Sequence, residues 1–181
     1  LLEPDWEHFK VFWENAVHRV PAMEDAGINR FCVSAESFTP DNRYLMGEAP
    51  EVKNLYLATG LNSTGIAAAP GVGKAMAEWI VNGAPTMDLW EVDIKRFHAF
   101  QSTKTYLHDR TVETVGTLYD KHYPHRQMES ARGARTSPLH DRIANLGACF
   151  GEVAGFERPM WYGPPGHSPQ YHYSFGRQNW F

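Results

Sequence analysis

A short loop with a glycine near each end carries the clearest chemical signal in this chain. It follows an apolar run at residues 55–59 and leads into a segment rich in small residues. A strand, a loop and a helix in this order bring free backbone N–H groups and the positive end of a helix dipole to the loop, where they favour an anion or a polar ring edge. The loop consists of Gly60, Leu61, Asn62, Ser63, Thr64, Gly65 and Ile66.

The loop differs from the phosphate-binding P-loop. It lacks that motif's lysine and spacing, so we do not expect a nucleoside triphosphate as its ligand. Gly60 and Gly65 would let the backbone approach a ligand where a side chain would collide. On these residues alone, an ordinary turn between a strand and a helix is an equally good interpretation.

Helices and strands that could position the loop are readable from apolar spacing and from proline. We expect helices at residues 4–20, 69–81, 103–119 and 138–146, and strands at residues 28–33, 55–59 and 148–153. Pro4 and Pro138 fit the first turn of a helix, where a missing N–H costs little. The third helix is expected to bury a face formed by Tyr106, Leu107, Val112, Val115, Leu118 and Tyr119. The aromatic and proline-rich residues 155–181 are expected to wrap over a neighbouring domain as extended chain.

Composition excludes several classes of function. The net charge of −4 gives no basic footprint for nucleic acid. No apolar run approaches the roughly 20 residues that span a bilayer, so we expect no membrane span. Cys32 and Cys149 lie in apolar runs and are expected to be buried free thiols. His122 and His125 are separated by a proline that breaks helical register, so we expect no metal site.

Several polar residues allow a functional and a structural interpretation. Asp41 and Arg43 could clamp a substrate, but a turn-stabilising aspartate and a solvated or sheet-bridging arginine are favoured by the turn composition around them. Glu36 is expected on a strand that approaches the loop. Arg126, Arg132 and Arg135 form a modest basic run, which is interpreted as a solvated loop or a contact between domains.

The strand, loop and helix resemble the C-terminal part of the flavin domain in FAD-dependent amine oxidoreductases of the D-amino-acid oxidase superfamily. The resemblance is strongest to the dimethylglycine and sarcosine dehydrogenases and to their non-catalytic relative, the regulatory subunit of pyruvate dehydrogenase phosphatase. Blocks similar to that subgroup follow its order at residues 3–9, 36–41, 135–142, 156–159 and 175–181. Nearly the whole chain is therefore covered.

The resemblance implies a mixed α/β and α+β fold in two parts. Residues 1–84 would be the C-terminal part of the FAD-dependent oxidoreductase domain, and residues 85–181 a small, aromatic-rich central domain. In this family a glycine-rich dinucleotide fingerprint precedes the region and a folate-binding domain follows it. We therefore expect an internal segment of a longer chain, inactive in isolation, because FAD binding also needs the βαβ unit with that fingerprint.

The implied cofactor is FAD, with its ring edge at the loop of Gly60 to Ile66. Reduction of a flavin builds negative charge at its N1–C2=O edge, which fixed N–H donors stabilise. In the related monomeric sarcosine oxidases the positions that match Thr64 and Ala67 are a histidine and a lysine. This chain has neither, so no catalytic residue is assigned.

The implied activity is oxidation of an N-methyl amine such as dimethylglycine or sarcosine by hydride transfer to FAD. The one-carbon unit would pass to tetrahydrofolate in a domain outside these residues. The alternative is a regulatory subunit without turnover. The implied partners are a small amine and the rest of the parent chain, in the mitochondrial matrix of a eukaryote or the cytoplasm of a bacterium.

Overall fold

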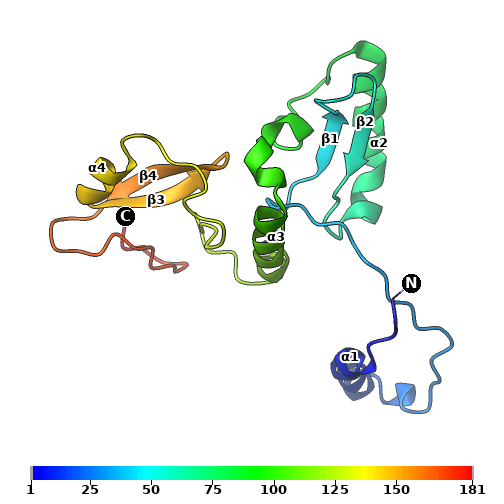
Figure 1. Ribbon diagram of the computed structural model, residues 1–181. Helices are drawn as coiled ribbons and strands as arrows, with labels where there is room; N and C mark the ends of the chain where they lie inside the picture. The colour runs from blue at the N-terminus through cyan, green and yellow to red at the C-terminus, as the bar shows by residue number, and fades with distance from the viewer. Residues whose placement is uncertain (1, 181) are drawn as a thin grey trace. The chain divides into compact units, whose positions relative to one another are not determined.

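The chain divides by packing into two compact units, residues 1–36 (unit 1) and residues 37–181 (unit 2), and the computed structural model describes residues 2–180 of it (Figure 1). Helices and short antiparallel strands are both present, as expected for a mixed fold. The domain boundary predicted between residues 84 and 85 stays a prediction.

Unit 1 is built on one helix, α1 (Trp6–Arg19), followed by the 3-10 helix η1 (Pro21–Met23). The carboxylate of Asp5 caps α1 by accepting a hydrogen bond of 2.9 Å from the backbone N–H of His8. The predicted first helix is therefore confirmed. Pro4, however, lies before this cap and not in the first turn.

The strand predicted at residues 28–33 is wrong. Val33 forms only an isolated bridge to Leu2, and Glu36 lies outside any strand. Phe31 instead packs against α1, with its ring centroid 4.5 Å from that of Trp6. Apolar residues of this segment thus find contacts on a helix, so no sheet forms around them.

Unit 2 begins with a hairpin of β1 (Leu45–Glu48) and β2 (Tyr56–Thr59), paired antiparallel with Leu45 opposite Thr59. β2 confirms the strand predicted at residues 55–59. It is less buried than expected, because its last two residues are exposed.

Helix α2 (Gly65–Asn82) packs on this hairpin. Its buried members Ala75, Met76 and Trp79 form an apolar core with Met46 of β1. The helix begins four residues earlier than predicted, so Pro70 lies inside it. A proline there leaves the Ile66 carbonyl without its helical partner, and because Ile66 is exposed, water can replace that bond.

The described rest of unit 2 contains four helical segments before a second hairpin. In chain order the elements are η2 (Ile94–Arg96), η3 (Ala99–Ser102), α3 (Lys104–Leu118), α4 (His140–Asn145), β3 (Ala148–Val153) and β4 (Phe156–Tyr162). α3 and β3 match their predicted ranges closely. α4 is shorter than predicted and begins after Leu139, so Pro138 precedes it.

Of the face predicted for α3, only Tyr106 is buried. The buried residues of the helix are Tyr106, Arg110 and Thr114, spaced four apart, while Val112 is 61% exposed. The predicted face was chosen from apolar side chains alone. In the structure the stripe is polar at two of three positions, and hydrogen bonds to other segments satisfy it.

The second hairpin corrects the prediction of an extended wrap for the first part of residues 155–181, and for the residues after β4 the wrap stays a prediction. Ala154 and Gly155 both have positive φ, as a two-residue turn between right-twisted strands requires. The segment after that turn is a strand, β4, and not an extended wrap. Beyond β4 the chain folds back, and the Tyr173 hydroxyl oxygen accepts a hydrogen bond of 2.9 Å from the Gln127 N–H.

Two guanidinium–carboxylate pairs, each with one buried partner, hold this hairpin to the residues before it. Arg110 of α3 binds Glu152 of β3 through two nitrogens, at 3.1 and 2.6 Å. Arg132 binds Glu157 of β4 at 2.7 and 2.5 Å, and the Gly133 N–H adds a third bond to Glu157. Arg132 is therefore not a solvated member of a basic run.

Of the two free cysteines, Cys149 is buried and Cys32 is exposed. Both are free thiols, as predicted, but the expected burial of Cys32 is wrong. Burial raises the pKa of the Cys149 thiol, which keeps it in the protonated, unreactive form.

Gly47 of β1 offers a direct test of this core. Its φ is +109°, and an added Cβ would lie 2.5 Å from the Trp79 ring. We expect Gly47→Ala to lower the free energy of unfolding by about 2 kcal/mol in chemical denaturation, through strain and overpacking.

A matched control is Gly116→Ala in α3, where an added Cβ meets nothing within 4 Å. Alanine has the higher helix propensity, so this variant should gain roughly 0.5–1 kcal/mol. Equal losses in the two variants would contradict the packing described for Gly47.

Glu157 should make stability depend on pH in acid. Burial alone would raise the pKa of Glu157, but the hydrogen bonds from Arg132 and the Gly133 N–H outweigh burial and hold the pKa below its usual 4.5. The stabilisation is therefore complete above about pH 4.5 and is lost as the pH falls through the lower pKa of the folded state.

We expect Glu157→Gln to lower the free energy of unfolding by about 2–3 kcal/mol at neutral pH, the cost of weakened hydrogen bonds to a charged group, and to flatten its decline between pH 5 and pH 2. Glu129→Gln, at an exposed position, is the control and should leave the acid profile unchanged. An unchanged profile in Glu157→Gln would contradict this assignment.

Candidate functional site

The loop predicted from sequence connects β2 to α2 in the structure (Figure 1). Gly60 has φ +63°, and a Cβ there would lie 2.5 Å from the Thr39 methyl carbon. Only glycine meets both requirements. Asn62 and Ser63 also have positive φ, which turns the chain sharply into the first residue of α2.

Asn62 anchors the loop from within. It is 3% exposed, and its amide oxygen accepts a 2.8 Å hydrogen bond from the Thr39 N–H. Its amide nitrogen donates to the Gly60 carbonyl at 2.7 Å and to the Thr39 hydroxyl at 3.2 Å. Because both ends of the amide are occupied inside the protein, Asn62 shapes the loop and its side chain is not a ligand-facing group.

Thr64 is the N-cap residue of α2, yet its side chain makes no cap hydrogen bond to the helix. Its hydroxyl donates to the Leu61 carbonyl at 2.6 Å and lies 3.0 Å from the Tyr44 hydroxyl. The threonine hydroxyl is therefore directed back into the loop. The first turn of α2 keeps its dipole without a side-chain cap from Thr64.

Ile66 follows at the start of α2 and is 98% exposed. A large apolar side chain next to a turn of backbone amides offers two surfaces at once, one apolar and one rich in N–H donors. A flavin ring has an apolar face and a polar edge, so the residues present fit that group. Gly65 lets the start of α2 lie close to Leu61, because a Cβ there would come within 3.3 Å of the Leu61 side chain.

The turn at residues 39–43 lies beside the loop and is held by charged groups. Asp41 accepts hydrogen bonds from Arg96 at 2.7 and 3.0 Å and from the Arg43 N–H at 3.1 Å. Asp41 is thus the turn-stabilising residue predicted. Arg43 pairs with Glu91 in an exposed contact of 3.4 Å. Sequence reasoning did not find Arg96, because its partner lies 55 positions away.

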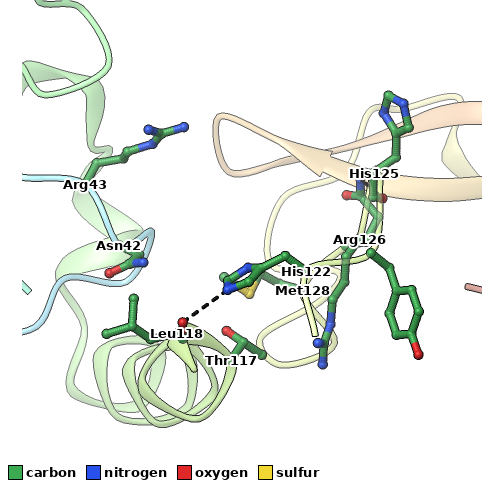
Figure 2. A pocket seen from close by; sticks show the side chains of 10 residues that line it. Asn42, Arg43, Thr117, Leu118, His122, His125, Arg126 and Met128 are labelled. Atoms are coloured by element: carbon green, nitrogen blue, oxygen red, sulfur yellow. Dashed lines mark hydrogen bonds between the residues drawn. The ribbon is translucent and has the colours of Figure 1, made fainter. Parts of the chain in front are cut away.

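A cavity of about 410 Å³ lies near this turn, lined in part by Asn42, His122 and His125 (Figure 2). Its basic side chains do not converge, since Arg43, His125 and Arg126 point in different directions in Figure 2. Arg126 is paired with Asp120 at 2.8 Å, and His122 donates to a backbone carbonyl. The arrangement therefore does not form an anion site.

Other predicted groups are placed as follows. Arg135 stacks over the Phe156 ring, 4.5 Å from its centroid. Within residues 2–180, no set of three His, Cys, Asp or Glu side chains is arranged to hold a metal ion. No helix in that part of the chain has the length and apolar character needed to cross a membrane.

Comparison with known proteins places the chain among flavoproteins. Residues 1–79 match the family model for FAD dependent oxidoreductases, and residues 82–137 match the model for the FAD dependent oxidoreductase central domain. The chain belongs to the FAD-dependent oxidoreductase family.

Within that family, the chain is similar to enzymes named for N-methyl amines. It is 52% identical over 178 residues to 4-methylaminobutanoate oxidase (formaldehyde-forming) of Paenarthrobacter nicotinovorans. The matched residues make up 98% of this chain and 22% of that protein. The chain is 38% identical over 176 residues to human mitochondrial sarcosine dehydrogenase, covering 97% of this chain and 19% of that protein.

A relative named as a regulator is also similar. The mouse mitochondrial pyruvate dehydrogenase phosphatase regulatory subunit is 40% identical over 164 residues, covering 91% of this chain and 19% of that protein. The chain spans about a fifth of the length of the curated relatives it matches.

A substitution of Asn62 tests whether its buried hydrogen bonds hold the loop in place. Asn62→Ala removes the partner of the Thr39 N–H and leaves buried polar groups unpaired, which should cost about 2–3 kcal/mol of unfolding free energy. Denaturant titration monitored by tryptophan fluorescence measures this loss.

Asn54→Ala is the matched control, because Asn54 also has positive φ but is exposed. It isolates the backbone cost and should lose about 1 kcal/mol or less. If Asn62→Ala cost no more than Asn54→Ala, the buried amide would have no role in holding the loop.

Proposed function

We propose that this chain is a segment of a flavoprotein that oxidises N-methyl amines and passes the electron pair to FAD as a hydride equivalent. The observation that carries the proposal is the 52% identity, across 98% of the chain, to an enzyme named 4-methylaminobutanoate oxidase. The similarity to sarcosine and dimethylglycine dehydrogenases supports the same substrate class.

The role proposed for this segment is to hold one edge of the FAD ring. Bound FAD supplies the two-electron acceptor. The N–H groups of Asn62 and Thr64 are used inside the protein, so the N–H groups of the first turn of α2, which begins at Gly65, face the edge where negative charge develops on reduction. Ile66 covers an apolar surface beside that edge and excludes water from it.

The geometry supports this role because the loop is fixed before any ligand arrives. Asn62 holds it from inside, and Thr64 is directed away from the helix end. Preorganised dipoles stabilise developing charge without paying to reorient at the moment of reaction. The acid or base that removes the amine proton is assigned to no residue of this chain.

The proposal includes the organisation of the parent protein. Residues 1–84 complete the flavin domain and residues 85–181 form the central domain. Transfer of the one-carbon unit to tetrahydrofolate belongs to a domain outside these residues. The proposed location is the mitochondrial matrix for a eukaryotic parent and the cytoplasm for a bacterial one.

A second candidate is a regulatory subunit that keeps the fold without turnover. The 40% identity to the pyruvate dehydrogenase phosphatase regulatory subunit is the observation that favours it. The enzyme is preferred because the identity to the amine oxidase is higher and covers more of the chain.

The visible absorption spectrum of the whole purified protein tests the proposal. We expect the band of oxidised flavin, and we expect it to bleach without oxygen when 4-methylaminobutanoate, sarcosine or dimethylglycine is added, since the amine reduces FAD. The same amine without its N-methyl group serves as the control and should leave the flavin band unchanged.

If the folded protein bound no flavin, the proposed enzymatic function would be overturned and the regulatory function would be favoured. A flavin band that none of the N-methyl amines bleaches would retain the flavoprotein and reject the substrate class.

A further inference from the structure

The hydroxyl groups of Tyr44 and Thr64 form a hydrogen bond whose direction can be deduced. The Thr64 hydroxyl lies 2.6 Å from the Leu61 carbonyl, which can only accept, so the single threonine proton is donated there. The Tyr44 hydroxyl lies 3.0 Å from the same threonine oxygen. Tyr44 must therefore be the donor to Thr64.

This ordered chain of two hydrogen bonds starts from a rigid group. The Tyr44 ring is half-buried and packs against the core that contains Met46 and Trp79. A tyrosine side chain has only two rotatable bonds before its ring is fixed, so little freedom remains once the ring is packed. Tyr44 thus connects the apolar core to the exposed end of the loop.

The exposed Thr64 has few other restraints. Its backbone N–H bonds to the Leu61 carbonyl, and its hydroxyl makes no cap bond to α2. Asn62 supports the loop from the opposite side, through Thr39. Without the Tyr44 hydroxyl, the second half of the loop loses its support from the core.

We infer that Tyr44 is a positioning residue for the flavin-edge loop: its phenol orients the Thr64 hydroxyl and, through it, the Leu61 carbonyl, so that the loop amides meet FAD in one conformation. The inference rests on the proposed function of the loop. Tyr44 acts through Thr64 and needs no contact with substrate.

Tyr44→Phe in the whole protein removes one hydroxyl and keeps the packed ring. We expect FAD to dissociate about five-fold more readily, the effect of one lost hydrogen bond of ordinary strength. At a fixed solution potential the ratio of reduced to oxidised flavin should also fall, because disordered loop amides stabilise the reduced anion less well. The FAD released on ultrafiltration measures the first change, and spectrophotometric titration against a redox dye measures the second; neither needs turnover.

Tyr56→Phe is the matched control. Tyr56 is half-buried and packs on the same core, but within residues 2–180 its hydroxyl has no protein hydrogen bond. This variant should leave FAD affinity and redox poise unchanged. A loss of equal size in Tyr56→Phe would assign the effect to general packing and overturn the inference.

A variant of Thr64 completes the test. Thr64→Val removes the hydrogen bond to the Leu61 carbonyl as well as the acceptor of the Tyr44 hydroxyl, so it should weaken FAD binding at least as much as Tyr44→Phe. Adding Tyr44→Phe to Thr64→Val should cause no further loss, because the Tyr44 hydroxyl then has no acceptor on Thr64. Additive effects would show that the two hydroxyls act separately and would overturn the inference.

The experiments distinguish a failure of the proposed function from a failure of this inference. Wild-type protein that binds no FAD would overturn both. Wild-type protein that binds FAD, with Tyr44→Phe unchanged in affinity and poise, would overturn only the role of Tyr44.

Discussion

The turn at residues 39–43 is the constraint on which the arrangement of unit 2 depends. Thr39 and Pro40 are buried, and the polar groups of the turn take their partners from three separate elements. Asn62 of the loop binds the Thr39 N–H, Arg96 of η2 binds the turn's aspartate, and Thr114 of α3 donates to a turn carbonyl at 3.0 Å. An unpaired buried polar group costs about 1–3 kcal/mol, so the three elements must meet the turn together. The position of the loop follows from this shared requirement.

Charged pairs extend the same logic to the second half of unit 2, where the apolar core is small. Arg110 and Arg132 each bind a carboxylate of the second hairpin through two nitrogens. Such pairs specify geometry more than they add net stability. Large apolar side chains such as Ile66, Val81 and Trp90 remain mostly exposed. Exposed surface of this kind accords with the proposal that the rest of a longer chain packs on this segment.

Local signals in the sequence were enough to predict some elements. Apolar spacing predicted the range of α3, and two glycines predicted the loop of the candidate site. Partners far away in sequence decided the rest. Pro159 argues against a strand, yet β4 includes it because a bulge between Cys149 and its neighbour shifts the register there. The buried stripe of α3 could not be predicted because Arg110 is buried only in the presence of Glu152.

The residues of the candidate site also fall into those that the sequence predicts and those that depend on distant partners. Glycine positions and the approach of a helix are properties of short segments, so Gly60 and the start of α2 could be predicted approximately. The anchoring role of Asn62 depends on Thr39, which lies 23 positions earlier, and the role of Tyr44 depends on a threonine 20 positions later. Single residues that act through such distant partners carry no local pattern.

The central claim is that the loop from Gly60 to Ile66 holds the edge of FAD. The most direct measurement is hydrogen exchange of the backbone amides at residues 61–68 in the whole protein, with and without FAD. The account predicts that FAD slows exchange of these amides, while those of β3 remain unchanged. Slower exchange elsewhere in the protein with no change at residues 61–68 would contradict it.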